Sequence, residues 1–178
     1  VLLPILKSGI YYGEAYDANI TPKEKDGVEL LDFDPSLLIK HEIDPVQELE
    51  PIPVLEVLKD DEGHTVYDFG QNIAGYVSLE LSGDKGSKIL IEHSEVLGLS
   101  KKNQQENKCN HFENANFRSA SAKIEYTLNG SANEKYKPHF TFMGFRYARI
   151  KVLSGNVNIK TITSIPISSL HEQKLQFQ

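Results

Sequence analysis

The amino-acid sequence predicts an all-β protein, an antiparallel β-sandwich of the jelly-roll type. Two observations carry this prediction. Apolar and polar residues alternate over short runs, for example between Val77 and Leu81, and a period of two is typical of half-buried strands. Turn sequences rich in Gly, Asn and Asp separate these runs, and no long stretch has the 3.6-residue period of a helix.

Residues 1–50 are predicted to form an extended lead-in from a preceding domain boundary. Six of the eight prolines lie within the first 53 residues. Proline fixes φ and removes a backbone donor, so this stretch is predicted to form neither a continuous helix nor a central strand. We expect one strand over 8–16 and one helical turn over 34–38, where Asp34 can cap and Pro35 suits the first helical position.

Residues 51–168 are predicted to form the sandwich, and residues 169–178 a linker. The polar stretch 99–121 has little periodicity, so it is either a solvated loop or a loop that lines a site. The aromatic residues Phe140, Phe142 and Phe145 are expected in the core. The strands are expected over 54–58, 64–69, 77–81, 88–93, 123–128, 136–142, 148–152 and 157–167.

Composition argues against several classes of partner. The 178 residues carry a formal net charge of -6, whereas a nucleic-acid binder needs a basic face to meet phosphates. No apolar run approaches the roughly 20 residues that span a bilayer, so no membrane association is expected. The single cysteine, Cys109, cannot form an internal disulfide, and the compartment stays open between cytoplasmic and exported.

The common catalytic motifs nominate no catalytic residue in this chain. The sequence contains no Gly-x-Ser-x-Gly elbow, phosphate-binding loop or His-Glu-x-x-His motif. Cys109, His111 and Glu113 lie close together, but one thiol and one imidazole are weak evidence for a metal site. We therefore expect neither a metal nor another cofactor.

Four residues are candidates for binding a hydroxyl-rich ligand. Asp68, Gln71 and Asn72 lie in one short stretch, and their carboxylate and amide groups can bond to vicinal hydroxyls. Tyr147 can cover the face of a sugar ring. The alternative is that the polar residues satisfy the backbone of a tight turn at a strand end.

A structural ion pair is predicted for Arg146. This residue shares the parity of Ala148, so its side chain should point to the buried side of a strand, where a lone charge is costly. We assign Glu95 as its partner, with Asp68 and Glu92 as the other candidates.

Five motifs in the same order together resemble bacterial α-L-rhamnosidases. They are residues 10–18 (IYYGEAYDA), 66–77 (VYDFGQNIAGYV), 91–97 (IEHSEVL), 126–130 (YTLNG) and 140–147 (FTFMGFRY). The resemblance implies a concanavalin-like β-sandwich that precedes an α/α-barrel, and the barrel would hold the acid and base of an inverting glycosidase. The expected partner is then this barrel, outside the present chain, and residues 169–178 would lead toward it.

The resemblance leaves three roles open. The chain is expected to be an accessory domain of an enzyme that hydrolyses terminal α-L-rhamnosyl bonds, and to be inactive alone. It could instead be a carbohydrate-binding module for rhamnosyl or related sugars, or a purely structural spacer that shapes the barrel entrance. An aromatic-lined cleft with convergent carboxylates would favour the binding module, and a large exposed apolar patch would favour the spacer.

Overall fold

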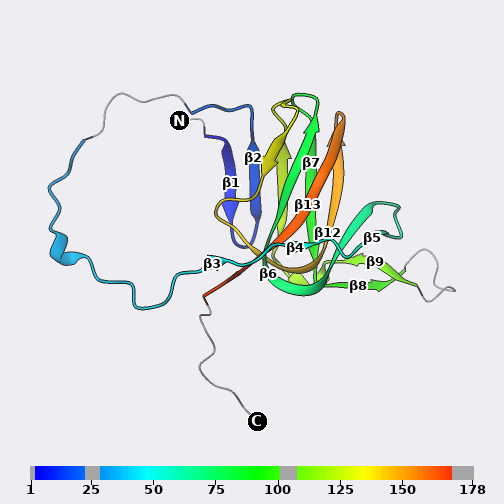
Figure 1. Ribbon diagram of the computed structural model, residues 1–178, viewed down its shortest axis with the longest axis horizontal. Helices are drawn as coiled ribbons and strands as arrows, with labels where there is room; N and C mark the ends of the chain where they lie inside the picture. The colour runs from blue at the N-terminus through cyan, green and yellow to red at the C-terminus, as the bar shows by residue number, and fades with distance from the viewer. Residues whose placement is uncertain (1–2, 23–28, 101–107, 170–178) are drawn as a thin grey trace, which may run out of the picture.

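The computed structural model describes residues 3–22, 29–100 and 108–169, and it confirms the all-β fold (Figure 1). Eleven strands form one curled sheet in the order β1-β2-β10-β7-β12-β6-β13-β3, to which β4, β5 and β11 add at the sides. The strands β8 and β9 form a separate pair. Among the described residues, no helix is long and apolar enough to cross a membrane.

The strands and two short 3-10 helices have the following bounds: β1 (Ile5–Gly9), β2 (Gly13–Asp17), η1 (Pro35–Leu37), β3 (Gln47–Glu48), β4 (Ile52–Pro53), β5 (Glu56–Lys59), β6 (Thr65–Gly83), β7 (Lys88–Ser94), β8 (Val96–Leu99), β9 (Cys109–Glu113), η3 (Ala115–Phe117), β10 (Lys123–Thr127), β11 (Glu134–Tyr136), β12 (Met143–Ser154) and β13 (Val157–Ser168).

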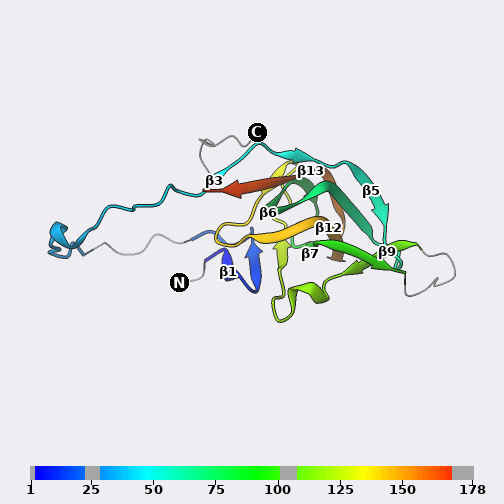
Figure 2. The same cartoon turned by 90° about the horizontal axis from the view of Figure 1, so that it is seen from below.

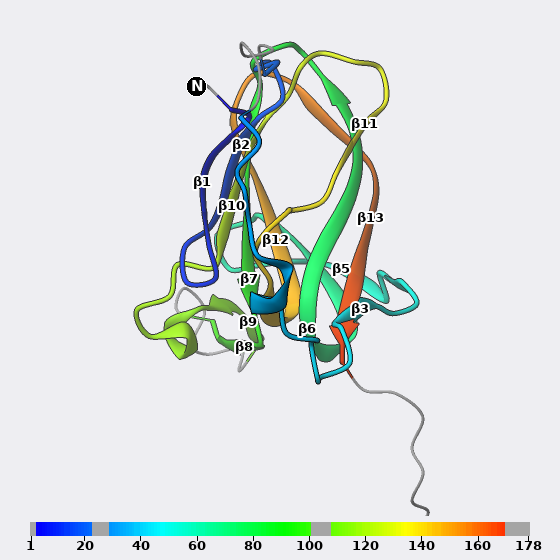
Figure 3. The ribbon, with the colours of Figure 1, turned by 90° about the vertical axis from the view of Figure 1, so that its left-hand side faces the viewer.

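The long strand β6 belongs to both layers of the sandwich. Its first part pairs with β5 and β12, and its last part pairs with β13 and β11. The two expected strands 64–69 and 77–81 are therefore one element. At Gly75 a Cβ atom would lie 2.0 Å from the carbonyl oxygen of Ile165, so only glycine fits where β13 crosses. Figure 3 shows β6 and β13 on one side of the core and β1, β2 and β10 on the other.

Apolar side chains from both layers fill one core. Leu79 on β6, Ile91 on β7, Ile124 on β10 and Phe145 on β12 are each at most 1% exposed. They occupy the inward positions of alternating strands, as a period of two requires. The core thus follows from the pattern that predicted the strands.

The N-terminal region contributes two strands to this sheet instead of one. A turn at residues 10–12 divides the expected strand 8–16 into the hairpin β1–β2, and β2 runs parallel to β10. At Gly13, φ is +86°, and a Cβ atom would lie 1.8 Å from the carbonyl oxygen of Lys123. This glycine lets the hairpin approach β10. The domain boundary at residue 50 stays a prediction.

Residues 29–46 run in a wide arc outside the sandwich (Figures 1 and 2). The expected helical turn is confirmed as η1, where Asp34 accepts a hydrogen bond from the backbone N–H of Ser36 over 2.9 Å. Large apolar residues of this arc are at least half exposed: Leu30, Leu31, Phe33, Leu37, Leu38, Ile39, Ile43 and Val46. We call residues 29–46 the arc.

The expected strand 136–142 is mostly irregular. The strand β11 ends at Tyr136, and Pro138 lacks the N–H that would continue the ladder. Phe140 and Phe142 are 74% and 46% exposed, so their expected place in the core was wrong, whereas Phe145 is buried. The buried Thr141 donates a hydrogen bond from Oγ1 to the carbonyl oxygen of Gly9 over 3.1 Å, and its two neighbours face the other way.

The expected loop 99–121 is partly ordered. The strands β8 and β9 form a hairpin, and η3 follows. Residues 101–107 lie outside the described residues, as do 170–178 of the expected linker. Phe112 of β9 is buried under the guanidinium of Arg149, with 4.3 Å between the guanidinium carbon and the ring centre. The hairpin therefore covers part of the outer face of β12.

Candidate functional site

The guanidinium of Arg146 binds the carboxylate of Asp68 through two parallel hydrogen bonds. Nε donates to Oδ1 and Nη2 to Oδ2, each over 2.8 Å, which is the geometry of strong arginine–carboxylate pairs. The N–H of Gly70 donates to Oδ1 over 2.7 Å. The hydrogen bond from Arg146 lowers the pKa of Asp68 below its usual value of 3.8, although burial opposes this shift. Asp68 is thus a buried, ionised carboxylate with both oxygens engaged.

The partner of Arg146 is Asp68, so the predicted pairing with Glu95 is wrong. The reason is a bulge: β12 pairs with β6 at Phe145 and again at Tyr147, so Arg146 has no partner in the ladder. The bulge breaks the parity that the sequence suggested, and the Arg146 side chain is 36% exposed. A carboxylate oxygen of Glu95 lies instead 3.3 Å from where a Cβ of Gly144 would stand.

The other sugar-binding candidates do not converge on a common cavity. Gln71 and Asn72 are exposed in the part of β6 that the bulge leaves unpaired with β12. Tyr147 is half-buried, and the guanidinium of Arg146 lies over its ring with 5.0 Å to the ring centre. Among the described residues, the structure therefore brings Asp68, Arg146 and Tyr147 together: Arg146 forms an ion pair with Asp68, and its guanidinium stacks on the ring of Tyr147.

A second buried charge cluster centres on Arg149 of β12. Its Nε and Nη2 donate to Glu92 of β7 over 3.0 and 2.8 Å, and its Nη1 donates to Asp60 over 2.7 Å. The carboxylate of Glu92 also forms ion pairs with the ammonium groups of Lys123, at 3.2 Å, and Lys151, at 3.0 Å. Burial works to raise the pKa of Glu92, but the three cations outweigh it and lower the pKa. This cluster joins β7, β10, β12 and the turn before β6.

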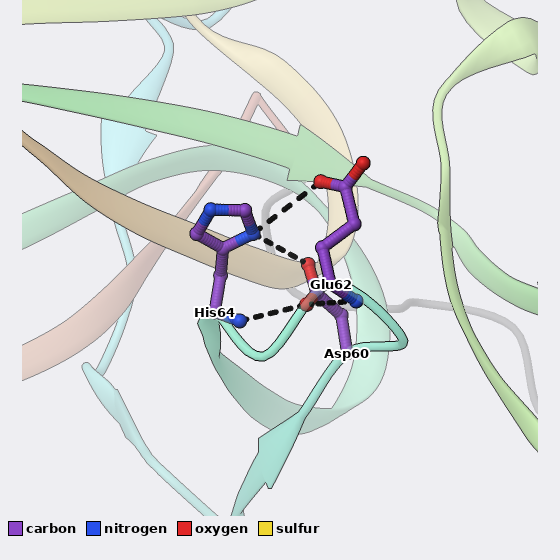
Figure 4. Close-up of side chains that lie close together, drawn as sticks. All are labelled: Asp60, Glu62 and His64. Carbon is purple, nitrogen blue, oxygen red and sulfur yellow. Dashed lines mark hydrogen bonds and ion pairs between the residues drawn. The ribbon is translucent and has the colours of Figure 1, made fainter. Parts of the chain in front are cut away.

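Asp60, Glu62 and His64 lie close together in that turn (Figure 4). His64 Nδ1 lies 3.3 Å from Asp60 and 3.4 Å from Glu62, and Asp60 accepts the backbone N–H groups of Glu62 and His64. The guanidinium of Arg149 already binds Oδ2 of Asp60, the oxygen that faces the imidazole ring of His64. A cation at this position would compete with Arg149, so the residues fit a capped turn better than a metal centre.

Sequence reasoning missed the Arg149 cluster. A signal was present, because Arg149 on β12 and Glu92 on β7 are charged residues on the outward positions of two apolar strands. They become direct neighbours in the register of the sheet. Their burial could not be foreseen, because it comes from the distant hairpin β8–β9 and the turn before β6.

An open groove of about 780 Å³ lies where β13 leaves the sandwich. Aromatic and aliphatic side chains form much of its wall, including Tyr76, Phe140, Phe142, Val46 and Ile167. A second hollow of about 680 Å³ shares Val46 and Ser169 with the first. We call the two together the groove face. None of the predicted sugar-binding residues lines either hollow.

The polar groups at the rim of the groove satisfy one another. Glu48 accepts hydrogen bonds from the hydroxyl of Tyr76 and the ammonium of Lys137. These bonds lower the pKa of Glu48, with the bond from Lys137 contributing most. Burial, with the negative charge of Glu48, raises the pKa of Tyr76 to about 12. The groove therefore presents aromatic surface beside an ionised carboxylate whose charge is paired with Lys137.

Two similar proteins of known function are α-L-rhamnosidases. An α-L-rhamnosidase of Streptomyces avermitilis is 33% identical over 90% of this chain, and one of Formosa agariphila is 27% identical over 93%. The chain spans only 16% and 18% of those two proteins. It is thus similar to one part of each relative.

Solved structures of α-L-rhamnosidases are also similar to this chain. The structure of the Streptomyces avermitilis α-L-rhamnosidase complexed with L-rhamnose matches 92% of this chain with a TM-score of 0.71 and 31% identity. The Aspergillus terreus α-L-rhamnosidase matches 92% with a TM-score of 0.67 and 27% identity. The chain covers 16% and 19% of those structures. The sequence profile of the bacterial α-L-rhamnosidase concanavalin-like domain matches residues 58–168. The chain therefore belongs to the family of bacterial α-L-rhamnosidase concanavalin-like domains.

Proposed function

We propose that this domain serves an α-L-rhamnosidase that hydrolyses terminal α-L-rhamnosyl bonds, and that the domain alone is inactive. The proposal is supported by the family match and by the small share of the relatives that the chain spans. The observation that carries it is the state of the buried carboxylates. Glycoside hydrolysis needs two carboxyl groups that flank the scissile bond, one of them a general acid with a raised pKa.

Three buried carboxylates of this domain have the opposite character. Asp60, Asp68 and Glu92 all have lowered pKa values, and each of them binds an arginine. Glu14 is also buried, and it accepts hydrogen bonds from the hydroxyl of Tyr136 and the backbone N–H of His139. Such groups stabilise the fold, and they are poorly suited to protonating a leaving group.

Of the two alternative roles, the structural spacer receives more support than the sugar-binding module. Large apolar side chains are exposed along the arc and at the groove face, as expected for a surface that another part of the protein covers. Among the predicted sugar-binding residues, Asp68 and Tyr147 are each engaged by Arg146, and Gln71 and Asn72 are exposed on the surface. Carbohydrate binding by Asp68, Gln71, Asn72 and Tyr147 stays a prediction.

The test is an assay of the purified 178-residue chain on an aryl α-L-rhamnoside. We expect release of the aryl group at the rate of a buffer blank. The matched control is the full-length protein that contains this domain, which should hydrolyse the same compound. Turnover by the isolated chain well above the blank would contradict the proposal.

A further inference from the structure

The groove face has an apolar wall that its own framework holds open. Thr141 is anchored to Gly9, and the backbone N–H of His139 is anchored to the buried carboxylate of Glu14 over 2.9 Å. Phe140 and Phe142 lie next to these two anchored residues, and their side chains are 74% and 46% exposed. The two hydrogen bonds tie residues 139 and 141 to the framework of the domain, and the exposed ring of Phe140 lies between them.

The negative charge of Glu48, at the rim of the first hollow, is already paired. Lys137 and the hydroxyl of Tyr76 each donate a hydrogen bond to its carboxylate. Val46, at the junction of the two hollows, is 63% exposed. An apolar partner that covers this surface would gain from burial without stranding Glu48. The end of the arc forms most of the wall of the second hollow, including the exposed Ile43 and Val46.

The position of the chain exit points to one occupant. The strand β13 ends at Ser168, and Ser169, which follows it, lines both hollows. Any polypeptide that continues beyond this domain therefore starts at the groove face. The relatives are about six times as long as the matched region, since the chain spans 16% of the Streptomyces avermitilis protein.

We propose that the groove face is the docking surface for the polypeptide that follows this domain in a full-length α-L-rhamnosidase. The partner is a surface of that same polypeptide with exposed apolar side chains, and Phe140 and Val46 are its anchors on this side. This inference rests on the proposed function, because that function supplies the larger protein. It adds which surface makes the contact.

Hydrogen exchange of the isolated chain and of the full-length protein tests the proposal. In the full-length protein, we expect the amides of residues 46–48 and 139–142 to exchange roughly tenfold more slowly than in the isolated chain, because docking must open before they exchange. The double variant Phe140→Asp with Val46→Asp should remove this difference. Both positions are exposed in the isolated chain, so the variant should keep its melting temperature there.

The matched control is Leu153→Asp, at a residue that is 51% exposed near the turn between β12 and β13. This turn precedes the twelve-residue β13, whereas the groove face lies where β13 ends, so the whole strand separates the control position from the groove. The control should retain the full protection of the groove amides. Equal exchange in the isolated chain and the full-length protein would overturn the proposal.

Two further outcomes separate this inference from its alternatives. If sedimentation shows that the isolated chain is a dimer, and the double variant makes it a monomer, a second copy occupies the groove face and the proposal is wrong. If the full-length protein does not cleave the rhamnoside but its groove amides are protected, the proposed function fails while docking is supported.

Discussion

Replacement of Arg149 by methionine should destabilise the domain strongly at neutral pH. The Arg149 side chain is 8% exposed, and its guanidinium binds Asp60, whose side chain is fully buried, and Glu92, whose side chain is 5% exposed. Removing one member of a buried ion pair costs about 3–5 kcal/mol, because the partner charge is left uncompensated. Glu92 keeps Lys123 and Lys151, so we expect the lower end, about 3 kcal/mol.

The same variant should lose this penalty in acid. The folded-state pKa values of Asp60 and Glu92 are lowered from their usual 3.8 and 4.5. Groups with a lowered pKa contribute stability above the unfolded pKa and lose it as the pH falls through the folded pKa. The difference between the wild type and Arg149→Met should therefore be full above about pH 5 and shrink toward pH 3.

Urea unfolding at neutral pH and at pH 3 measures the difference in the free energy of unfolding between the wild type and Arg149→Met. The exposed Arg118→Met is the matched control, because it removes the same charge from the surface and should change the free energy of unfolding by less than about 0.5 kcal/mol. A loss below about 1 kcal/mol for Arg149→Met at neutral pH would refute the reasoning. A loss that stays constant down to pH 3 would show that Asp60 and Glu92 are not the stranded charges.

Two other predictions concern the Arg146–Asp68 pair and its neighbours. Arg146→Leu should lower the free energy of unfolding by about 1–2 kcal/mol, less than Arg149→Met, because the Arg146 side chain is 36% exposed and solvent screens the Asp68 carboxylate that remains. An unchanged melting temperature would show that the pair contributes nothing to stability. Calorimetry should detect L-rhamnose binding no tighter than about millimolar, near -4 kcal/mol, and a micromolar complex that Asp68→Ala abolishes would instead establish a sugar-binding module.

The sequence predicted the regular strands because their signal is local. Alternation located β7, β10 and β13 to within a few residues, and Asp34 with Pro35 located η1. Features that depend on distant segments were not accessible in this way. The bulge at Arg146 arises where four residues of β6 oppose one of β12, and no local pattern announces it.

Exposure is the second property that the sequence could not provide. The pattern at 140–142 alternates as a core strand would, but Thr141 is the residue that turns inward, and the two aromatic rings turn outward. Conversely, Arg149 occupies a position that would face solvent in a bare sheet, and Phe112 of the distant β9 covers it. Which face is buried depends on what packs against it, and that information is not local.

The shared strand β6 also determines when this domain can fold during synthesis. Its last part is a neighbour of β13, and Gly83 pairs with Val157 near the end of the domain. A ribosome releases β6 long before β13. During that time Val77, Leu79 and Leu81 lack β13, the strand beside which they lie in the folded domain. Non-local pairing of this kind is slow to form. The nascent chain therefore carries an uncovered apolar strand until nearly the whole domain has emerged, and this interval is when a chaperone has most to protect.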